Sequence, residues 1–357
     1  MNRAFLYILK HYIKSFFIVL IGLVSIITLI DFLQHMNSIV GINRALLYLY
    51  FTFNNILNLL YPIVMVFALI LVLSKLLFNN HLLILQSFGY SKYFILTPFL
   101  IASISIYLIM VALNFTTFAY SGDRAKAILN NSSNIFKPVN NIFFKYNNSF
   151  VSAKEMDIVK KELKGVTLYF IDNSRKVDYI MEFKKAKFNN GEWLVDKLVK
   201  KSFIYKNGVP QGYRVEDINK TKILKGYYPK VVRLLYEGKR MSISDGIRAK
   251  RLLTSQNIDD SKITSALLER LIMPLFAPLL IVIITLLIPI HKRYFNRAKF
   301  FFWSLGATLI LWSLLYSTNM MSINGVIPSY LGQPLIVILL FIFTIYIVIK
   351  KQKSLNS

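Results

Sequence analysis

The residues that could do covalent chemistry are few and scattered along the chain. There are no cysteines, which excludes disulfides, cysteine-bound zinc and thiol nucleophiles. The sequence contains neither a GxxxxGK[ST] loop for nucleotide phosphates nor a Ser–His–Asp arrangement with supporting spacing. No HExxH pattern or paired carboxylate accompanies the four histidines, which are His11, His35, His81 and His291. We therefore expect no metal, no cofactor and no catalysis by this chain alone.

Polar residues inside long apolar segments are the next candidates, since polar groups are costly in a bilayer and often mark function. The acidic residues near such segments are Asp31 and Glu269, and each lies at a segment end where water or headgroups can solvate it. Asn54 and Asn55 lie within one apolar segment and are expected to hydrogen-bond between helices. This pattern favours packing over a buried proton relay or an ion site.

The composition indicates a membrane protein. Hydrophobic residues make up 55% of the 357 residues, and the mean hydropathy is +0.50, whereas soluble domains contain roughly 45–50% apolar residues. The formal net charge of +26 accompanies many Lys, Asn, Ile, Phe and Tyr residues. An AT-rich genome produces the same bias, so the charge alone does not indicate nucleic acid, and we expect no nucleic-acid partner.

Charge-free windows predict six membrane-spanning helices, because a helix needs about 20 apolar residues to cross the hydrocarbon. The first follows Arg3, Lys10 and Lys14 and is closed by Asp31 without a cleavage site, so we read it as a retained helix. The windows are 15–30, 45–74, 93–122, 271–291 and 300–349, and the last divides into two helices at the turn-forming residues of 317–334.

Loop charges predict the orientation, because short cytoplasmic loops are enriched in Lys and Arg. On one side, the loops roughly 34–46 and 317–333 contain Arg44 as their only Lys or Arg residue. The other side carries twelve basic residues: Arg3, Lys10, Lys14, Lys75, Lys92, Lys292, Arg293, Arg297, Lys299, Lys350, Lys351 and Lys353. Both termini are therefore expected in the cytoplasm, and the large insert outside.

The insert, 123–262, reads as an all-β domain between helices 1–3 (1–122) and helices 4–6 (263–357). Short alternating runs such as 166–170 and 179–183 are followed by Asn190-Gly191 and, later, Asn207-Gly208. Asn-Gly between alternating runs is a strong hairpin signal. We expect a sandwich or a β-jelly-roll-like domain rather than an α/β unit.

The loop between helices 2 and 3 predicts a short helix over about 79–90. The spacing places Leu82, Leu85 and Phe88 on one face, and Gly89 is a plausible stop. An apolar helix face in the cytosol is expected to be shielded from water. Either a partner protein binds it, or the helix lies on lipid headgroups.

The order of these parts, together with local sequence, resembles the LptF/LptG permease family of lipopolysaccharide export. The resemblance covers nearly the whole chain and is greatest to the LptG branch, mainly through Asp31-Phe32-Leu33 after helix 1. The similar segments in the insert and the last three helices are Leu163–Tyr169, Asn190–Asp196, Glu269–Leu275, Gly325–Pro328 and Gln333-Pro334.

The resemblance implies a half-transporter of the bacterial inner membrane, without a cofactor of its own. The implied partners are an LptF-like paralogue, an LptB-like ATPase dimer, an LptC-like membrane-anchored protein and an LptA-like periplasmic bridge. The implied substrate is lipopolysaccharide, which is extracted from among the membrane lipid of the inner membrane and passed along a periplasmic β-jelly-roll bridge.

The resemblance also implies two sets of site residues. The ATPase-docking coupling helix comprises Asn80, His81, Leu82, Leu83, Leu85, Gln86, Phe88 and Gly89. The lipid-path candidates are Asp31, Gln34, His35, Arg44, Phe144, Leu168, Phe170, Met181 and Phe183.

This chain departs from the family pattern at three of these places. The family usually has Ser-Glu where this chain has Asn80-His81, and Arg where it has Gln86. Asp31 stands where some LptG proteins carry a basic residue suited to lipid phosphates. Phosphate contact there would require Arg44 or a partner to supply the charge.

Two other function classes fit the same organisation. One is the permease of another ABC exporter that moves lipoproteins or peptides, and crosslinked cargo separates it from a lipopolysaccharide exporter. The other is a membrane enzyme acting on lipid-linked sugars, which usually needs a carboxylate-rich loop. The acidic residues of the insert are instead interleaved with Lys.

Overall fold

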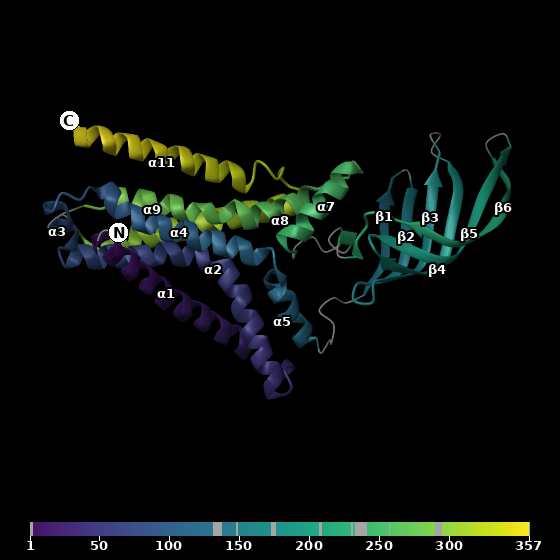
Figure 1. The fold of residues 1–357 in the computed structure, drawn as a ribbon, viewed down its shortest axis with the longest axis horizontal. Helices are drawn as coiled ribbons and strands as arrows, with labels where there is room; N and C mark the ends of the chain where they lie inside the picture. Colours follow the sequence, from purple (N-terminus) through teal and green to yellow (C-terminus); the bar gives the residue numbers. More distant parts are fainter. Residues whose placement is uncertain are drawn as a thin grey trace. The chain divides into compact units, whose positions relative to one another are not determined.

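The computed structural model describes residues 3–130, 138–147, 149–172, 176–206, 209–229, 231–232, 241–256, 258–289 and 295–356. The chain forms two compact units, one of Met1–Ala125 with Thr264–Ser357 and one of Lys126–Ile263. The first unit is helical and the second is built on a β-sheet (Figure 1).

Within the described residues, six helical segments are long and apolar enough to cross a membrane, which confirms the predicted number (Figure 1). The fourth segment is interrupted at Met273–Leu275 (η3), where Pro274 interrupts regular helical hydrogen bonding. The six are α1 (Arg3–His35) with the 3-10 turn η1 (Met36–Ser38), α2 (Ile42–Phe78), α4 (Lys92–Asn114), α8 (Ser261–Leu271) with η3 and α9 (Phe276–Leu287), α10 (Arg297–Ile323), and α11 (Gln333–Asn356).

Helix α2 is the centre of the helical unit. In its most apolar window 72% of the residues are buried, against 22% for α1, 17% for α10 and 22% for α11. The Tyr12 hydroxyl of α1 donates a hydrogen bond of 3.0 Å to the Met65 carbonyl of α2. The three lightly buried helices therefore present most of the apolar surface that lipid or partner helices can cover.

Short helices connect the spans. Helix α3 (His81–Ser87) lies between α2 and α4, at the same end of the helical unit as the N- and C-termini (Figure 1). It begins after Asn80, whose φ is 57°, and is followed by Gly89, whose φ is 81°. A residue with positive φ on each side fixes the two turns, and glycine adopts this conformation without strain. After α4 come η2 (Thr117–Tyr120) and α5 (Ser121–Leu129).

The second unit holds a six-stranded antiparallel sheet, which confirms the predicted all-β insert (Figure 1). Each strand pairs with the next one in the chain, so the described strands form a single meander. Helix α7 (Ile243–Ser255) belongs to the same unit. The strands are β1 (Val139–Tyr146), β2 (Ser149–Asp157), β3 (Glu162–Ile171), β4 (Val177–Asn189), β5 (Glu192–Lys206) and β6 (Val209–Ile223).

The sheet builds its core on one face, and residues of 224–229 and 231–232 cover part of that face. Trp193 is fully buried, and its indole N–H donates to the Tyr227 carbonyl at 2.7 Å. The Tyr227 hydroxyl donates to the Lys145 carbonyl at 2.6 Å. Burial raises the pKa of Tyr227 to about 12, so this hydroxyl remains a donor at neutral pH. These bonds satisfy the polar atoms that the aromatic core buries.

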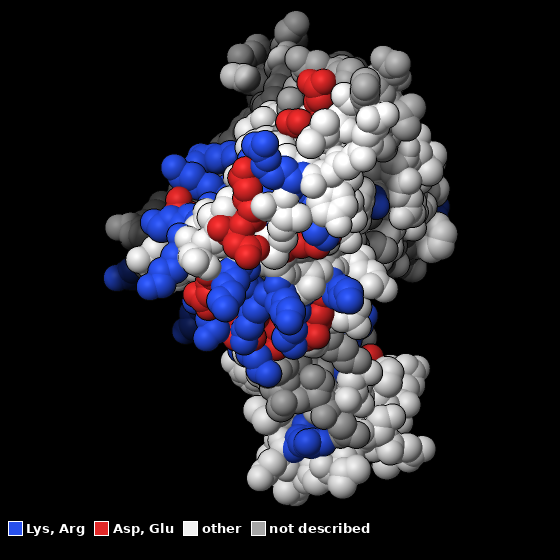
Figure 2. All heavy atoms as spheres, turned by 90° about the vertical axis from the view of Figure 1, so that its right-hand side faces the viewer, with Lys and Arg blue, Asp and Glu red and all other residues white. Residues whose placement is uncertain are grey.

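Charged side chains of the sheet unit lie interleaved, with Lys and Arg beside Asp and Glu (Figure 2). Lysines pair with glutamates across neighbouring strands at 2.7 to 3.1 Å. A hydrogen bond from Lys185 lowers the pKa of Glu162. Exposed pairs contribute little stability, but they show that the charges of this unit form a solvated surface. The pairs are Glu155–Lys164, Glu162–Lys185, Glu182–Lys201 and Glu192–Lys222.

Candidate functional site

Helix α3 is amphipathic in the folded chain, and its exposed face differs from the one that spacing suggested. Leu82 is only 5% exposed, and Leu85 is partly buried against the core of the helical unit. Phe88 is 76% exposed, Ile84 47% and Leu83 39%. A partner can therefore contact Leu83, Ile84 and Phe88, whereas Leu82 is covered by the chain's own helices. Ile84 was absent from the predicted set, although its spacing from Phe88 places both on one helix face.

His81, at the start of α3, is held by α1. Its Nδ1 lies 3.0 Å from the Tyr7 hydroxyl, and the two rings meet edge to face with centroids 5.8 Å apart. This contact anchors the start of α3 to the first span. Asn80 and Gly89 contribute the backbone turns on either side.

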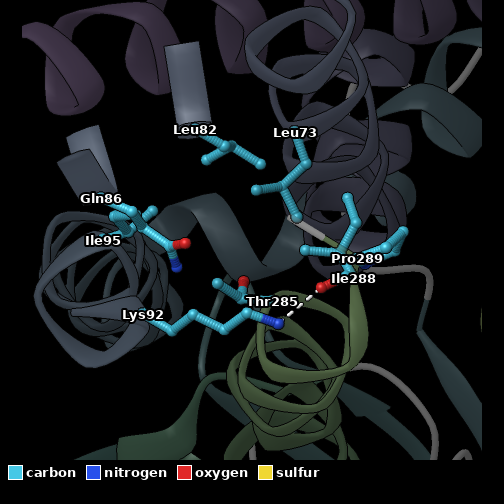
Figure 3. Close-up of a pocket in the computed structure, with 8 residues that line it drawn as sticks. All are labelled: Leu73, Leu82, Gln86, Lys92, Ile95, Thr285, Ile288 and Pro289. Carbon is cyan, nitrogen blue, oxygen red and sulfur yellow. Dashed lines mark hydrogen bonds between the residues drawn. The ribbon is translucent and has the colours of Figure 1, made fainter. Parts of the chain in front are cut away.

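Gln86 also lies on the inner side of α3. Together with Leu82 it lines a small pocket between α3, α4 and the end of α9 (Figure 3). In the same pocket the Lys92 ammonium donates to the carbonyl of Leu286 at 3.2 Å and to that of Ile288 at 2.6 Å. Gln86 therefore contacts the interior of the helical unit. Lys92 is a partly buried cation, whereas the sequence indicated only a loop charge.

Two of the lipid-path candidates meet between the ends of α1 and α2. The Tyr48 hydroxyl donates to the Asp31 carboxylate at 2.5 Å, and the His35 ring lies 3.3 Å from the same hydroxyl. The His35 Nδ1 is 3.9 Å from the Asp31 carboxylate. Gln34 and Arg44 are exposed. Tyr48 was missed, because nothing in the sequence pairs it with a residue on α1.

The remaining five lipid-path candidates share one face of the sheet. Leu168 of β3 is paired with Met181 of β4, and directly paired residues point to the same side. Phe144, Leu168 and Phe183 are buried in the sheet core, whereas Phe170 and Met181 are only partly buried at its margin.

The two ends of this sheet face differ in what covers them. At the buried end, the Phe144 ring stacks on Tyr227 of the covering segment, with centroids 5.2 Å apart. At the open end, the Phe170 ring stacks on Tyr179 at 4.2 Å. The Lys200 ammonium lies over the Tyr179 ring at 4.8 Å, and Lys200 pairs with Met181. The open end is therefore apolar with a cationic border, which the alternation pattern alone did not predict.

Polar side chains connect the middle of α2 with the C-terminal ends of α4 and α8. Asn58 and Asn114 exchange hydrogen bonds of 3.2 and 2.7 Å, and Arg270 donates to the Asn114 side-chain oxygen. The interhelical hydrogen bonds were predicted at Asn54 and Asn55, but Asn58, about one turn further along α2, makes them. Asn54 is partly buried and Asn55 is exposed. Separately, Asn319 of α10 donates to the Glu269 carboxylate at 2.8 Å.

The described residues contain no group of three or more His, Cys, Asp or Glu that could hold a metal ion. His291, Lys292 and Arg293 lie outside the described residues.

The chain was compared with models of known protein families and with curated proteins. A family model described as lipopolysaccharide export system permease LptF/LptG matches residues 6–350, a range that includes the sheet insert and at least part of every span. No curated protein matches the chain. The family match does not distinguish LptF from LptG, but it covers nearly the whole sequence. The chain therefore belongs to the LptF/LptG family of lipopolysaccharide export permeases.

Proposed function

We propose that the chain is the LptG-like permease subunit of an ABC-type lipopolysaccharide exporter. In this proposal it lies in the bacterial inner membrane with both termini in the cytoplasm and the sheet unit in the periplasm. It pairs with an LptF-like paralogue, extracts lipopolysaccharide from the membrane and passes it through the sheet unit to LptC-like and LptA-like proteins. An LptB-like ATPase dimer supplies the energy.

The observation that carries the proposal is the exposed apolar surface of α3. Leu83, Ile84 and Phe88 form it, at the end of the helical unit where the termini lie (Figure 1). A seven-residue helix cannot hold its position alone. Here Leu82 and the Tyr7–His81 contact hold it from inside. An anchored helix with three exposed apolar residues suits a groove on a partner protein.

The chemistry of α3 differs from the acidic contact that the family usually makes. No residue of α3 is charged at neutral pH, apart from the titratable His81. Docking would then rest on apolar burial, at roughly 25 cal/mol per Å² of surface removed from water. Electrostatic steering of the ATPase by α3 itself would be weak.

The sheet unit supports a lipid substrate through its partly open face. Phe170 and Met181 offer apolar contact, and Lys200 beside them is suited to an anionic head group. The buried end, under Tyr227, is already filled by the chain itself. Acyl chains would therefore enter at the open end.

Docking is tested by replacing Phe88 with Asp in the tagged full-length chain. We expect loss of ATPase co-purification in mild detergent, because a charge would be buried in an apolar contact. Asn79→Asp is the matched control, since it adds the same charge at an exposed position just before α3 and should leave co-purification unchanged. Undiminished binding by the Phe88→Asp protein would contradict the docking surface.

Cargo is tested with a photo-crosslinking residue at Met181 in cells. The expected product is lipopolysaccharide, formed only when ATP is available. The control position is Lys184, which lies on the same strand and is exposed. Capture of a lipoprotein or peptide at 181 would instead identify another class of ABC exporter.

A further inference from the structure

The first two side chains of α4 tie this helix to two later spans. Lys92 donates to the carbonyls of Leu286 and Ile288, at the C-terminal end of α9. Tyr93 donates from its hydroxyl to the Val348 carbonyl of α11 at 3.0 Å. Both side chains bond to backbone oxygens far away in the sequence. The beginning of α4 is thus attached to the fourth and sixth spans.

The bonds of Lys92 have a physical reason. The last carbonyls of a helix lack intrahelical partners and carry partial negative charge. A partly buried ammonium is costly unless such acceptors surround it. The end of α9 and the ammonium therefore stabilise each other, and a neutral side chain of similar length would not replace the contact.

Helix α3 shares the pocket in which these bonds lie. Leu82 and Gln86 line it from α3, facing Lys92, Thr285 and Ile288 (Figure 3). The space measures about 10 Å³, close to the minimum that one water needs. The Thr285 hydroxyl is buried there without a hydrogen-bond partner in the described structure. Only residues 88–91 separate α3 from α4, so a displacement of α3 reaches Lys92 through the chain and through the pocket.

We infer that Lys92 and Tyr93 form a clamp that transmits displacement of α3 to α9 and α11, and so couples ATP hydrolysis in the partner to movement of the fourth and sixth spans. The inference rests on the proposed docking of an ATPase at α3. It assigns Lys92 and Tyr93 as positioning residues, which act through their hydrogen bonds to α9 and α11.

The test measures how much lipopolysaccharide is delivered per ATP hydrolysed, using the intact complex in lipopolysaccharide-containing liposomes with a soluble acceptor. Lys92→Met removes the ammonium and keeps the length of the side chain. Tyr93→Phe removes one hydroxyl. We expect Lys92→Met to retain the ATPase but lower the ratio by about fivefold or more, as in typical coupling between sites. Tyr93→Phe should lower it less, and Lys92→Arg should preserve most of it.

Tyr107→Phe is the matched control. Tyr107 lies on α4 away from α3, and its hydroxyl donates to the Leu271 carbonyl at 2.8 Å. Tyr107→Phe and Tyr93→Phe each remove one hydrogen bond from a tyrosine hydroxyl to a backbone carbonyl. If such bonds served only to stabilise the fold, the two substitutions would change the delivery ratio equally. We expect the ratio to change at 93 and stay constant at 107.

Two results would overturn the clamp: an unchanged ratio in the Lys92→Met/Tyr93→Phe double variant, or an equal decrease in Tyr107→Phe. If the double variant does not assemble, the Tyr93→Phe and Tyr107→Phe pair decides alone. Failure of the proposed function looks different, since then the unmodified chain would recover no ATPase or deliver no lipopolysaccharide.

Discussion

Individual polar side chains inside the helical unit join spans that lie far apart in the sequence. Asn114 is the clearest case: it exchanges hydrogen bonds with Asn58 and also accepts one from Arg270. Three helices meet at one amide. Hydrogen bonds between membrane helices average about 0.6 kcal/mol and reach roughly 1.7, so a residue that serves several partners should matter more than a residue that serves one.

Asn114→Ala should therefore destabilise the helical unit more than Asn58→Ala, by about 1 to 2 kcal/mol against less than about 1. The comparison is made by thermal unfolding of both purified variants in the same detergent. Asn55→Ala is the control, since Asn55 is exposed and should behave as the unmodified chain. Equal effects at 58 and 114 would mean that the Arg270 bond contributes nothing.

Trp193 fills the centre of the sheet core and is 0% exposed. Trp193→Ala removes a large buried ring and the bond to the Tyr227 carbonyl, a change that typically costs about 3 to 5 kcal/mol. We expect much faster proteolysis of the sheet unit in the full-length protein, while the helical unit stays resistant. Tyr213→Ala, at a residue 59% exposed on β6, should leave the proteolysis rate nearly unchanged.

At the scale of elements, the sequence predicted what local patterns determine. The spans followed from the length of the charge-free windows. The β4–β5 hairpin followed from alternating runs joined by Asn190-Gly191, whereas Asn207-Gly208 lies outside the described residues. The orientation of α3 did not follow, because Leu82 to Leu85 are all apolar and no periodicity says which of them turns inward. Packing against α2, together with contacts to residues of α1, α4 and α9, decides that. For the same reason the pocket of Gln86 and Lys92 needed the structure, since its lining comes from segments about 200 residues apart.

The turn between α10 and α11 depends on a close approach at Gly332. A Cβ at this position would lie 2.5 Å from the Ser322 hydroxyl oxygen and 3.3 Å from the Thr318 carbonyl. Gly332→Ala should therefore lower stability by about 1 to 3 kcal/mol, as overpacking does. Adding Ser322→Ala to the Gly332→Ala chain should restore part of the lost stability. This second substitution removes the clashing hydroxyl, which is buried without a hydrogen bond.

A double-mutant cycle in thermal unfolding measures this rescue. Gly306→Ala in α10 is the control, since a Cβ there meets nothing within 4 Å. Additive effects at 322 and 332 would contradict the close approach.

At the scale of the whole molecule, the chain divides its residues between two solvents. The helical unit leaves large apolar areas of α1, α10 and α11 uncovered, whereas the sheet unit covers its surface with paired charges (Figure 2). Hydropathy predicted this division because it depends on composition over many residues. Which side of the membrane each loop faces follows from loop charge and remains a prediction.

The natural chain contains no cysteine, so single cysteines can test that orientation without a background. A membrane-impermeant thiol reagent applied to intact spheroplasts should label Asn324→Cys and Lys184→Cys. It should label Asn79→Cys and Gln352→Cys only after the membrane is opened. All four positions are exposed. Labelling of position 79 in intact spheroplasts would contradict the proposed orientation.

The sequential order of the sheet also bears on how the insert folds. Every strand pairs with its chain neighbour, so most contacts of the sheet close short loops, and short loops favour fast folding. Each hairpin can form as soon as its second strand is available, and the next strand adds to an existing edge. Without cysteines, no step waits for disulfide exchange. A segment that must be synthesised between two membrane spans can thus acquire its structure progressively, before the fourth span exists.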